Sequence, residues 1–427
     1  MAGAEHTFTT AENTAFEMAA LRHINSMLLS AGLSLAENFP DLPQPPPLEE
    51  SSRPDPVRAE IERWLTPEAG GGMQPRTTDS SSPPEPSLAE LQRQLNASQR
   101  LAFDRIMASV RASIAAEAAA PASAEWAAMA GASAPSHPTT TGCPMQQLPN
   151  FFFIDAPGGY GKTFLIKVLL ATVRSLGQVA LPCASSGIAA LLMEGGKTAH
   201  TTFSIPVSNL TDDSSCKLSE QTAKAKLIKA AKLIIWDEAP MTDKKAYGAV
   251  NRTLQGLMRN NLPFGGKIVV MAGDFRQVLP VVPRGSRASV VNACIKRHAL
   301  WRDVHILRLW ENMRVRALLE SLGEEAAADQ QRFADFLLAI GEGLGSDPRA
   351  PLLIPPQMVV PGERPQALIS AVFGDLVNDP RTREETRLMG RCILSPKNND
   401  VLAINEIITD MFPVNSPGEV RGREDER

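Results

Sequence analysis

The chain has 427 residues, which is enough for two or three domains, and 43% of them are hydrophobic, as in a globular protein. Its net charge of −4 excludes binding to nucleic acid through overall positive charge, so such binding would need a local basic groove. No apolar run is as long as a membrane-spanning helix, so we expect no membrane partner. Prolines are frequent and aromatic residues are few, above all in the N-terminal third, which we expect to be largely disordered or helical.

The cysteines indicate a reducing compartment. They are far apart, without the CxxC pair of a zinc site or the dense pattern of a disulfide framework, so we expect free thiols. The N-terminus carries Glu5 and Glu12 rather than a basic targeting segment, which favours an intracellular protein. The five positions are Cys143, Cys183, Cys216, Cys294 and Cys392.

The first third of the chain is expected to carry little chemistry. Residues 1–38 have helical apolar spacing, and residues 39–87 are rich in Pro, Ser and Gly, which is typical of a linker. Residues 88–110 resume a helical pattern that contains Gln99, and an alanine-rich spacer follows at 111–147. The amide of Gln99 could read an adenine edge, or it could be a solvated helix residue, and the pattern leaves both open.

The most informative stretch is Phe151–Leu170, FFFIDAPGGYGKTFLIKVLL. It predicts a short buried strand, a glycine-rich turn and a helix, which is the context of a phosphate-binding P-loop rather than of an ordinary turn. Lys162 would reach the β- and γ-phosphates, and the hydroxyl of Thr163 would bind Mg²⁺. Main-chain N–H groups would contact the nucleotide along the whole turn. The nucleotide contacts predicted here are Gly158, Gly159, Tyr160, Gly161, Lys162 and Thr163.

A second catalytic element is predicted at Lys232–Glu238, KLIIWDE, an apolar strand that ends in two carboxylates. In this Walker B pattern Asp237 would hold Mg²⁺, and Glu238 would orient and deprotonate the attacking water. An acidic pair at a strand end is often only an exposed turn. The spacing between this strand and the P-loop is typical of βαβ topology, which favours the catalytic interpretation of Asp237 and Glu238.

Two further side chains are candidates for contact with the γ-phosphate. A buried strand at Lys267–Ala272 leads into a loop that carries Gln277, and strand ends of an open α/β sheet meet at one crevice. Gln277 could be a γ-phosphate sensor or a plain loop residue, and Arg276 could simply pair with a neighbouring aspartate. Arg314 could enter from a second domain as an arginine finger, which its spacing alone does not prove.

The polar loop within Ser185–Pro206 is a candidate for contact with single-stranded nucleic acid. Lys197, Thr198 and His200 could grip phosphates, and a base could stack on Phe203. In the alternative interpretation this is a surface loop that Phe203 anchors in the core.

The remainder predicts the beginning of another α/β layer. Gln331–Ile340 and Gln366–Leu376 have helical patterns, and a strand at Arg391–Leu394 would lead into a helix at Asp400–Phe412. Residues 413–427 form a polar tail.

Taken together, seven blocks resemble Pif-type DNA helicases, relatives of RecD, with the helicase part of Helitron transposons as the nearest likeness. The resemblance extends from about Leu95 to Ile408, and seven blocks in order are far more specific than any one. The blocks are LNASQRLAFD, APGGYGKT, ASSGIAALLMEGGKTAH, LIIWDEAPM, PFGGKIVVMAGDFRQVLPVVPRGSR, LRLWENMR and LSPKNNDVLAIN.

The resemblance implies an α/β fold: a RecA-like P-loop NTPase domain at 148–310, with a parallel sheet flanked by helices, followed by an incomplete second RecA-like domain at 311–412. It implies ATP and Mg²⁺ as cofactors. It also implies an ATP-dependent helicase that moves 5′ to 3′ on single-stranded DNA and acts at forks, in repair, recombination, telomere maintenance or Helitron transposition. We expect a monomer in the nucleus, with the mitochondrion as the alternative location.

By position, Gln99 matches the family's adenine-reading glutamine, Gln277 its γ-phosphate sensor and Arg314 its first arginine finger. Thr198, His200 and Phe203 match the block that contacts DNA. Tyr160 departs from the family's usual threonine, so its ring must find room beside the nucleotide. The family's later blocks, with the second arginine finger, are absent from the sequence. A fragment that binds nucleotide and DNA without unwinding is therefore the alternative function.

Overall fold

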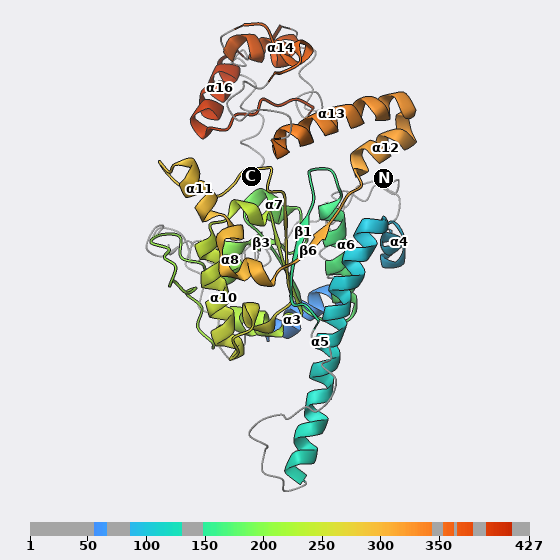
Figure 1. Cartoon of the computed structure of the whole chain (residues 1–427), viewed down its shortest axis with the longest axis vertical. Helices are drawn as coiled ribbons and strands as arrows, with labels where there is room; N and C mark the ends of the chain where they lie inside the picture. Colours follow the sequence, from blue (N-terminus) through green and yellow to red (C-terminus); the bar gives the residue numbers. More distant parts are fainter. Residues whose placement is uncertain are drawn as a thin grey trace, which may run out of the picture. The chain divides into compact units, whose positions relative to one another are not determined.

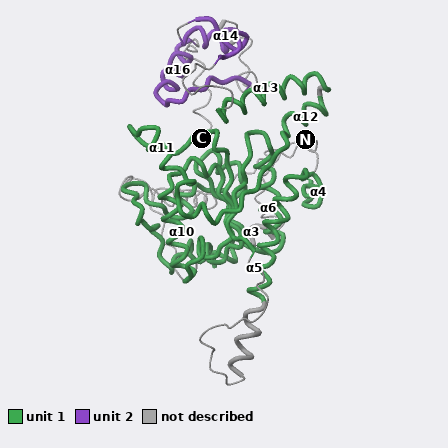
Figure 2. The backbone as a smooth tube through the Cα atoms, viewed as in Figure 1, with its two compact units in different colours: residues 1–344 green, residues 345–427 purple. Residues whose placement is uncertain are grey.

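The structure is a computed structural model that describes residues 55–65, 86–129, 148–343, 353–362, 365–378 and 390–411. The chain divides into two compact units, Met1–Leu344 and Gly345–Arg427, each of which is described by itself (Figure 2). The helix predicted in residues 1–38 and the tail at 413–427 lie outside the described residues.

The first unit is built on a six-stranded sheet in the order β3-β2-β4-β5-β1-β6. All of its strand pairs are parallel. The four central strands are almost entirely buried, because helices cover both faces, and this explains their continuous apolar sequences. The predicted parallel sheet flanked by helices is confirmed. The strands are β1 (Phe151–Asp155), β2 (Ala180–Ala184), β3 (Lys197–Thr198), β4 (Leu233–Asp237), β5 (Val269–Gly273) and β6 (His305–Arg308).

Alternate side chains of the strands enter two separate cores. Phe152 and Ile154 pack with residues of α5 and α6, whereas Phe151 and Phe153 pack in the cluster that includes α10. Figure 1 shows α5 and α6 on one side of the sheet and α10 on the other. The helices are α3 (Pro56–Leu65), α4 (Leu88–Arg93), α5 (Ala97–Met129), α6 (Lys162–Ser175), α7 (Gly187–Leu191), α8 (Ala199–Phe203), α9 (Ala223–Ala230), α10 (Lys244–Met258), α11 (Arg287–Ala293), α12 (Met313–Leu322) and α13 (Glu324–Glu342), and the 3-10 turns are η2 (Ala239–Met241), η3 (Pro263–Gly266), η4 (Ile295–Arg297) and η5 (Ala299–Asp303).

Two helical predictions near the N-terminus need correction. Residues 88–110 form parts of two helices, because a capping box between Ser87 and Glu90 begins α4 and the helical path is broken after Arg93. Helix α3 lies inside the range 39–87 that was expected to be linker. It forms because Val57 and Ile61 pack against the core on the α10 side of the sheet.

The described residues of the second unit form helices and irregular segments, without a strand. They comprise η6 (Pro356–Met358), α14 (Pro365–Asn378) and α16 (Asn398–Met411). The strand predicted at Arg391–Leu394 is wrong. Arg391 is held instead by α14, where Nη2 donates to Asp375 Oδ2 at 2.8 Å and Nη1 to the carbonyl oxygen of Val372 at 2.8 Å. Among the described residues of this unit, the short apolar run at Arg391–Leu394 has no neighbouring strand with which to pair.

Four of the cysteines lie in described residues, and all four are free thiols, as predicted. Cys183, Cys216 and Cys294 are buried, and burial raises the pKa of Cys216 to about 11. Cys143 lies outside the described residues. Among the helices that the structure describes, none combines the length and apolar character needed to cross a bilayer.

Candidate active site

The turn between β1 and α6 has the shape of an anion-binding site. Gly159 and Gly161 have φ values of +88° and +78°, a left-handed conformation that glycine adopts without steric cost. Within the described part of the chain, the main-chain N–H groups of residues 158–161 donate no hydrogen bond to another residue. Such N–H groups at the start of a helix form a ready site for phosphate.

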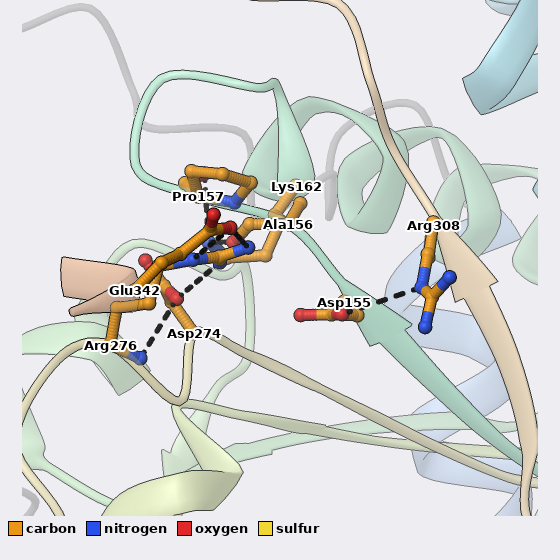
Figure 3. A network of polar contacts seen from close by, with 8 residues as sticks. All are labelled: Asp155, Ala156, Pro157, Lys162, Asp274, Arg276, Arg308 and Glu342. Atoms are coloured by element: carbon orange, nitrogen blue, oxygen red, sulfur yellow. Dashed lines mark hydrogen bonds and ion pairs between the residues drawn. The ribbon is translucent and has the colours of Figure 1, made fainter. Parts of the chain in front are cut away.

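Lys162 brings a positive charge to the same turn. Its side chain is buried, and Nζ donates to the carbonyl oxygens of Ala156 at 2.7 Å and Pro157 at 3.3 Å (Figure 3). Carbonyl groups thus hold the ammonium group inside the curve of the loop. Thr163 is exposed and lies in the first turn of α6. The predicted P-loop residues therefore lie together.

Two carboxylates at the end of β4 belong to the same electrostatic cluster. Asp237 is 5% exposed, and its Oδ1 accepts the main-chain N–H of Glu238 at 2.9 Å. Burial raises the pKa of Asp237, while this N–H group and the charge of Lys162 lower it. Burial and the charge of Asp237 raise the pKa of Glu238, Lys162 lowers it, and Asp274 adds a further upward effect. Glu238 therefore holds a proton more readily than an exposed glutamate does.

Asp274 anchors the loop that follows β5. Its Oδ1 accepts the main-chain N–H of Arg276 at 3.0 Å and Nη1 of the same residue at 2.7 Å. The guanidinium group also donates through Nη2 to Glu342 Oε1 at 3.3 Å, at the end of α13 (Figure 3). The alternative in which Arg276 pairs with a neighbouring aspartate is thus confirmed. Gln277 is exposed beside this pair.

A cavity of about 330 Å³ lies over the P-loop. Tyr160 contributes to its lining, so its ring lies at the predicted site, and partial burial raises the pKa of its hydroxyl. One wall is polar and comes from the P-loop and the loop after β5, while α13 supplies an apolar wall. The lining residues include Pro157, Gly158, Tyr160, Asp274, Arg276, Gln277, Asn312, Arg314, Phe333, Ala334, Leu337, Leu338 and Gly341.

Gln99 and Arg314 both lie against the P-loop. Gln99 is fully buried, and its amide donates to the carbonyl oxygen of Gly161 at 3.3 Å and accepts the N–H of Asn96 at 3.1 Å, so it is not a solvated helix residue. Arg314 is in α12 of the first unit, which corrects its predicted entry from a second domain. A Cβ atom added at Gly159 would lie 2.9 Å from Arg314 Cδ, so this arginine crosses the phosphate-binding turn itself.

Residues 139–350 match the sequence model of the PIF1-like helicases. This part of the chain therefore resembles the PIF1-like helicase family in sequence. The ATP-dependent DNA helicase Pif1 of a Psychrobacter species is 34% identical over 134 residues, which are 31% of this chain and 20% of that protein. The ATP-dependent DNA helicase RRM3 of Saccharomyces cerevisiae is 29% identical over 153 residues, or 35% of this chain and 21% of that helicase. The matched part of the chain thus spans about a fifth of these helicases.

Solved Pif1 structures also match. Bacteroides Pif1 bound to single-stranded DNA shares 26% identity over 42% of this chain and 45% of that one, with a TM-score of 0.34. Bacteroides Pif1 with ADP-AlF4 shares 28% identity over 40% of this chain and 41% of that one, also with a TM-score of 0.34. The strand order of the chain itself establishes its parallel α/β fold.

The segment at 197–203 differs from its prediction in one important respect. Phe203 is 2% exposed, and its ring stacks on Trp236 at a centroid distance of 5.6 Å. The ring therefore belongs to the core, as in the alternative interpretation that Phe203 anchors this loop. A buried ring cannot stack on a base. Thr198 caps α8, accepting the N–H of Thr201 at 3.2 Å.

Lys197 and His200 are exposed and remain available to a ligand. Neighbouring atoms still shield part of the imidazole from water, and this desolvation lowers the pKa of His200, which favours its neutral form.

The α13 wall and the acceptor role of Glu342 were missed from the sequence. Residues 324–342 show only an amphipathic helical pattern, which is common to helices that pack on any core. Nothing in these residue types distinguishes a helix that lines a nucleotide cleft. The one available signal was the loop after β5, where Asp274 and Arg276 needed a charged partner.

Proposed function

We propose that this chain carries the ATPase site of an ATP-dependent DNA helicase and that single-stranded DNA stimulates its turnover. The observation that carries the proposal is the convergence of the unpaired N–H groups of residues 158–161 with Lys162, Asp237 and Glu238. The names of the relatives, which are ATP-dependent DNA helicases, support it. Movement from 5′ to 3′, action at forks and a monomeric state are part of the same proposal.

The residues fit a magnesium-bound triphosphate. The N–H groups of the turn and Lys162 would bind its phosphates, as a preorganised cradle that is already in place. Oxygen ligands suit Mg²⁺, and Asp237 and Thr163 would supply them, with phosphate oxygens as the others. Bound Mg²⁺ would neutralise charge on the phosphates. Among the described residues, no three or more His, Cys, Asp and Glu side chains form a separate metal site.

Chemistry at the γ-phosphate would depend on three further groups. Glu238 would orient the attacking water and accept its proton, and its raised pKa places it closer to the working pH of a general base. Gln277 and Arg314 line the cavity beside Gly158 and would contact the transferring phosphoryl group. Gln99 would fix the adenine end by its position against the P-loop.

The DNA strand would be bound at a different surface. Lys197 and His200 are the exposed members of the predicted DNA segment, so they would contact phosphates, whereas Phe203 supports them from the core. This assigns sequence-independent contact to the segment and no base readout.

A second candidate function is nucleotide and DNA binding without strand separation. The described residues contain one parallel sheet, and those of the second unit form no strand. A motor that steps by closing two RecA-like domains would need both sheets. For a polypeptide of residues 1–427, we therefore expect DNA-stimulated ATP turnover with weak or no unwinding.

The test compares ATP turnover by residues 1–427 with and without single-stranded DNA, in the parent and in Lys162→Ala. We expect stimulation by DNA in the parent and a loss of about 100-fold or more in the variant, because the phosphates lose their buried cation. Lys167→Ala, at an exposed position of the same helix, is the matched control and should behave as the parent does. Parental turnover in Lys162→Ala would refute the proposal.

Strand separation is measured on duplexes with a 5′ or a 3′ single-stranded tail. Unwinding that requires the 5′ tail supports the complete helicase function with the proposed direction. DNA-stimulated turnover without unwinding supports the second candidate.

A further inference from the structure

The end of β5 touches the turn that follows the Walker B carboxylates. Gly273 is the last residue of β5, and Pro240 lies in η2, directly after Ala239. The two strands are neighbours, with Trp236 of β4 paired in register with Met271 of β5. A Cβ atom added at Gly273 would lie 2.9 Å from Pro240 Cγ and closer still to Cδ. The proline ring therefore occupies the space that any side chain at this position would need.

The turn around Pro240 has little freedom to move aside. Ala239 is fully buried, and its carbonyl oxygen accepts a hydrogen bond from the buried hydroxyl of Tyr247. At the other end of the turn, Thr242 Oγ1 donates to Ser185 Oγ at 2.8 Å. Both ends of η2 are thus tied to the packed interior, and a rigid proline ring cannot change rotamer to make room.

Glu238 is the residue from which this turn starts. Its φ of +49° is a left-handed conformation that non-glycine residues rarely adopt. Its carbonyl oxygen accepts the N–H of Met241 at 3.2 Å, and its own N–H donates to Asp237 Oδ1 at 2.9 Å. A displacement of Pro240 would therefore pass directly to the backbone of Glu238. Such strained conformations persist only where their surroundings hold them.

We propose that Gly273 is a positioning residue for ATP hydrolysis. Its lack of a side chain lets the Pro240 ring pack on the end of β5, and this packing holds Glu238 in the left-handed conformation beside Asp237 and Lys162. The same contact fixes the Walker B turn against the start of the loop that carries Gln277. The inference rests on the proposed ATPase function. It states that the contact between Gly273 and Pro240 aligns the catalytic base, Glu238. It predicts a defect in hydrolysis rather than in nucleotide binding, because the P-loop is not part of the contact.

The experiment is a double-variant cycle with a rescue. Gly273→Ala should lower kcat for ATP by about 10- to 100-fold, since a misplacement of about 1 Å has effects of this size. The dissociation constant of a non-hydrolysable ATP analogue should change by less than about threefold, because uniform binding is untouched. Pro240→Ala removes the ring atoms that collide, and because it also removes the packing that holds Glu238, it should lower kcat by itself, by less than Gly273→Ala does. The double variant should therefore recover toward the level of Pro240→Ala, though not completely, because Gly273 has a φ of +158° that strains any side chain.

Gly256→Ala is the matched control. This glycine is exposed in α10, has no atom within 4 Å of an added Cβ and lacks a positive φ, so turnover should match that of the parent. Thermal unfolding of each variant shows whether it folds. If Gly273→Ala alone fails to fold, a folded and active double variant supports the inference.

Three results would overturn the inference. The first is parental kcat in folded Gly273→Ala, and the second is an equal loss of nucleotide affinity and kcat, which indicates general damage. The third is a folded double variant whose kcat is no higher than that of Gly273→Ala, since the collision with the proline ring would then not be the cause of the loss. Absence of turnover in the parent is distinguishable from these, because it refutes the proposed function itself.

Discussion

The P-loop at 156–163 follows strand β1, whereas the polar segment at 197–203 consists of strand β3 and helix α8, and the two agree with their sequence patterns to different degrees. In the P-loop every predicted group is present: unpaired N–H groups, a buried ammonium group and carboxylates beside it. In the polar segment the cation is exposed, but the aromatic ring lies in the core. Main-chain geometry is encoded locally, whereas the side of a helix on which an aromatic residue lies depends on its tertiary neighbours.

The largest expected effect concerns the proposed catalytic role of Glu238, which lies next to the P-loop site. Glu238→Gln keeps the size of the side chain but removes the base, so turnover should fall by about 100- to 1,000-fold. Nucleotide affinity should stay near that of the parent, because the cradle and Lys162 are unchanged. A variant that hydrolyses ATP at the parental rate would separate this carboxylate from catalysis.

The core position of Phe203 makes a prediction for stability. Phe203→Ala should lower the free energy of unfolding by about 3–5 kcal/mol, since it removes a buried ring that stacks on Trp236. His200→Ala, at an exposed position of the same helix, should change it by less than about 0.5 kcal/mol. Chemical denaturation measures both. Unchanged stability in Phe203→Ala, with lost DNA binding, would restore the base-stacking interpretation.

Lys197 should contribute to DNA binding and little to stability. Lys197→Ala removes one phosphate contact, so the slope of log Kd against log salt for single-stranded DNA should fall by about 0.7. Affinity should weaken a few-fold at low salt. Lys167→Ala, on the other face of the sheet, is the control with the same charge change. Identical salt slopes for the parent and Lys197→Ala would remove this segment from the interface.

The smallest expected effect is on thermal stability at Asp237, and its size depends on pH. Burial raises the pKa of this carboxylate, so the folded state favours its protonated form and the ionised form destabilises the nucleotide-free protein. Asp237→Asn should therefore raise Tm by about 1–3 °C at neutral pH. The difference should shrink as the pH falls and the parental carboxylate becomes protonated. A variant that is less stable at neutral pH contradicts this sign.

The same contrast explains which features the sequence could reveal. The strands before Gly158 and at Asp237 were predicted because buried parallel strands are continuous apolar runs, and the spacing of glycines and Lys162 is itself the phosphate site. The burial of Gln99 against the P-loop was left open, since a helical pattern does not specify its neighbours. The run at 391–394 was apolar enough for a strand but had no ladder to join. The α13 wall depended on tertiary packing alone.

The central claim is that the turn at 158–161, Lys162, Asp237 and Glu238 form one site for a magnesium-bound triphosphate. It is tested most directly by equilibrium binding of a non-hydrolysable ATP analogue, with and without Mg²⁺, to the parent, Lys162→Ala and Glu238→Gln. We predict Mg²⁺-dependent binding in the parent, parental affinity in Glu238→Gln and a loss of about tenfold or more in Lys162→Ala, since charge-assisted contacts to phosphate are strong. Equal affinity of the parent and Lys162→Ala, or binding indifferent to Mg²⁺, would contradict the claim.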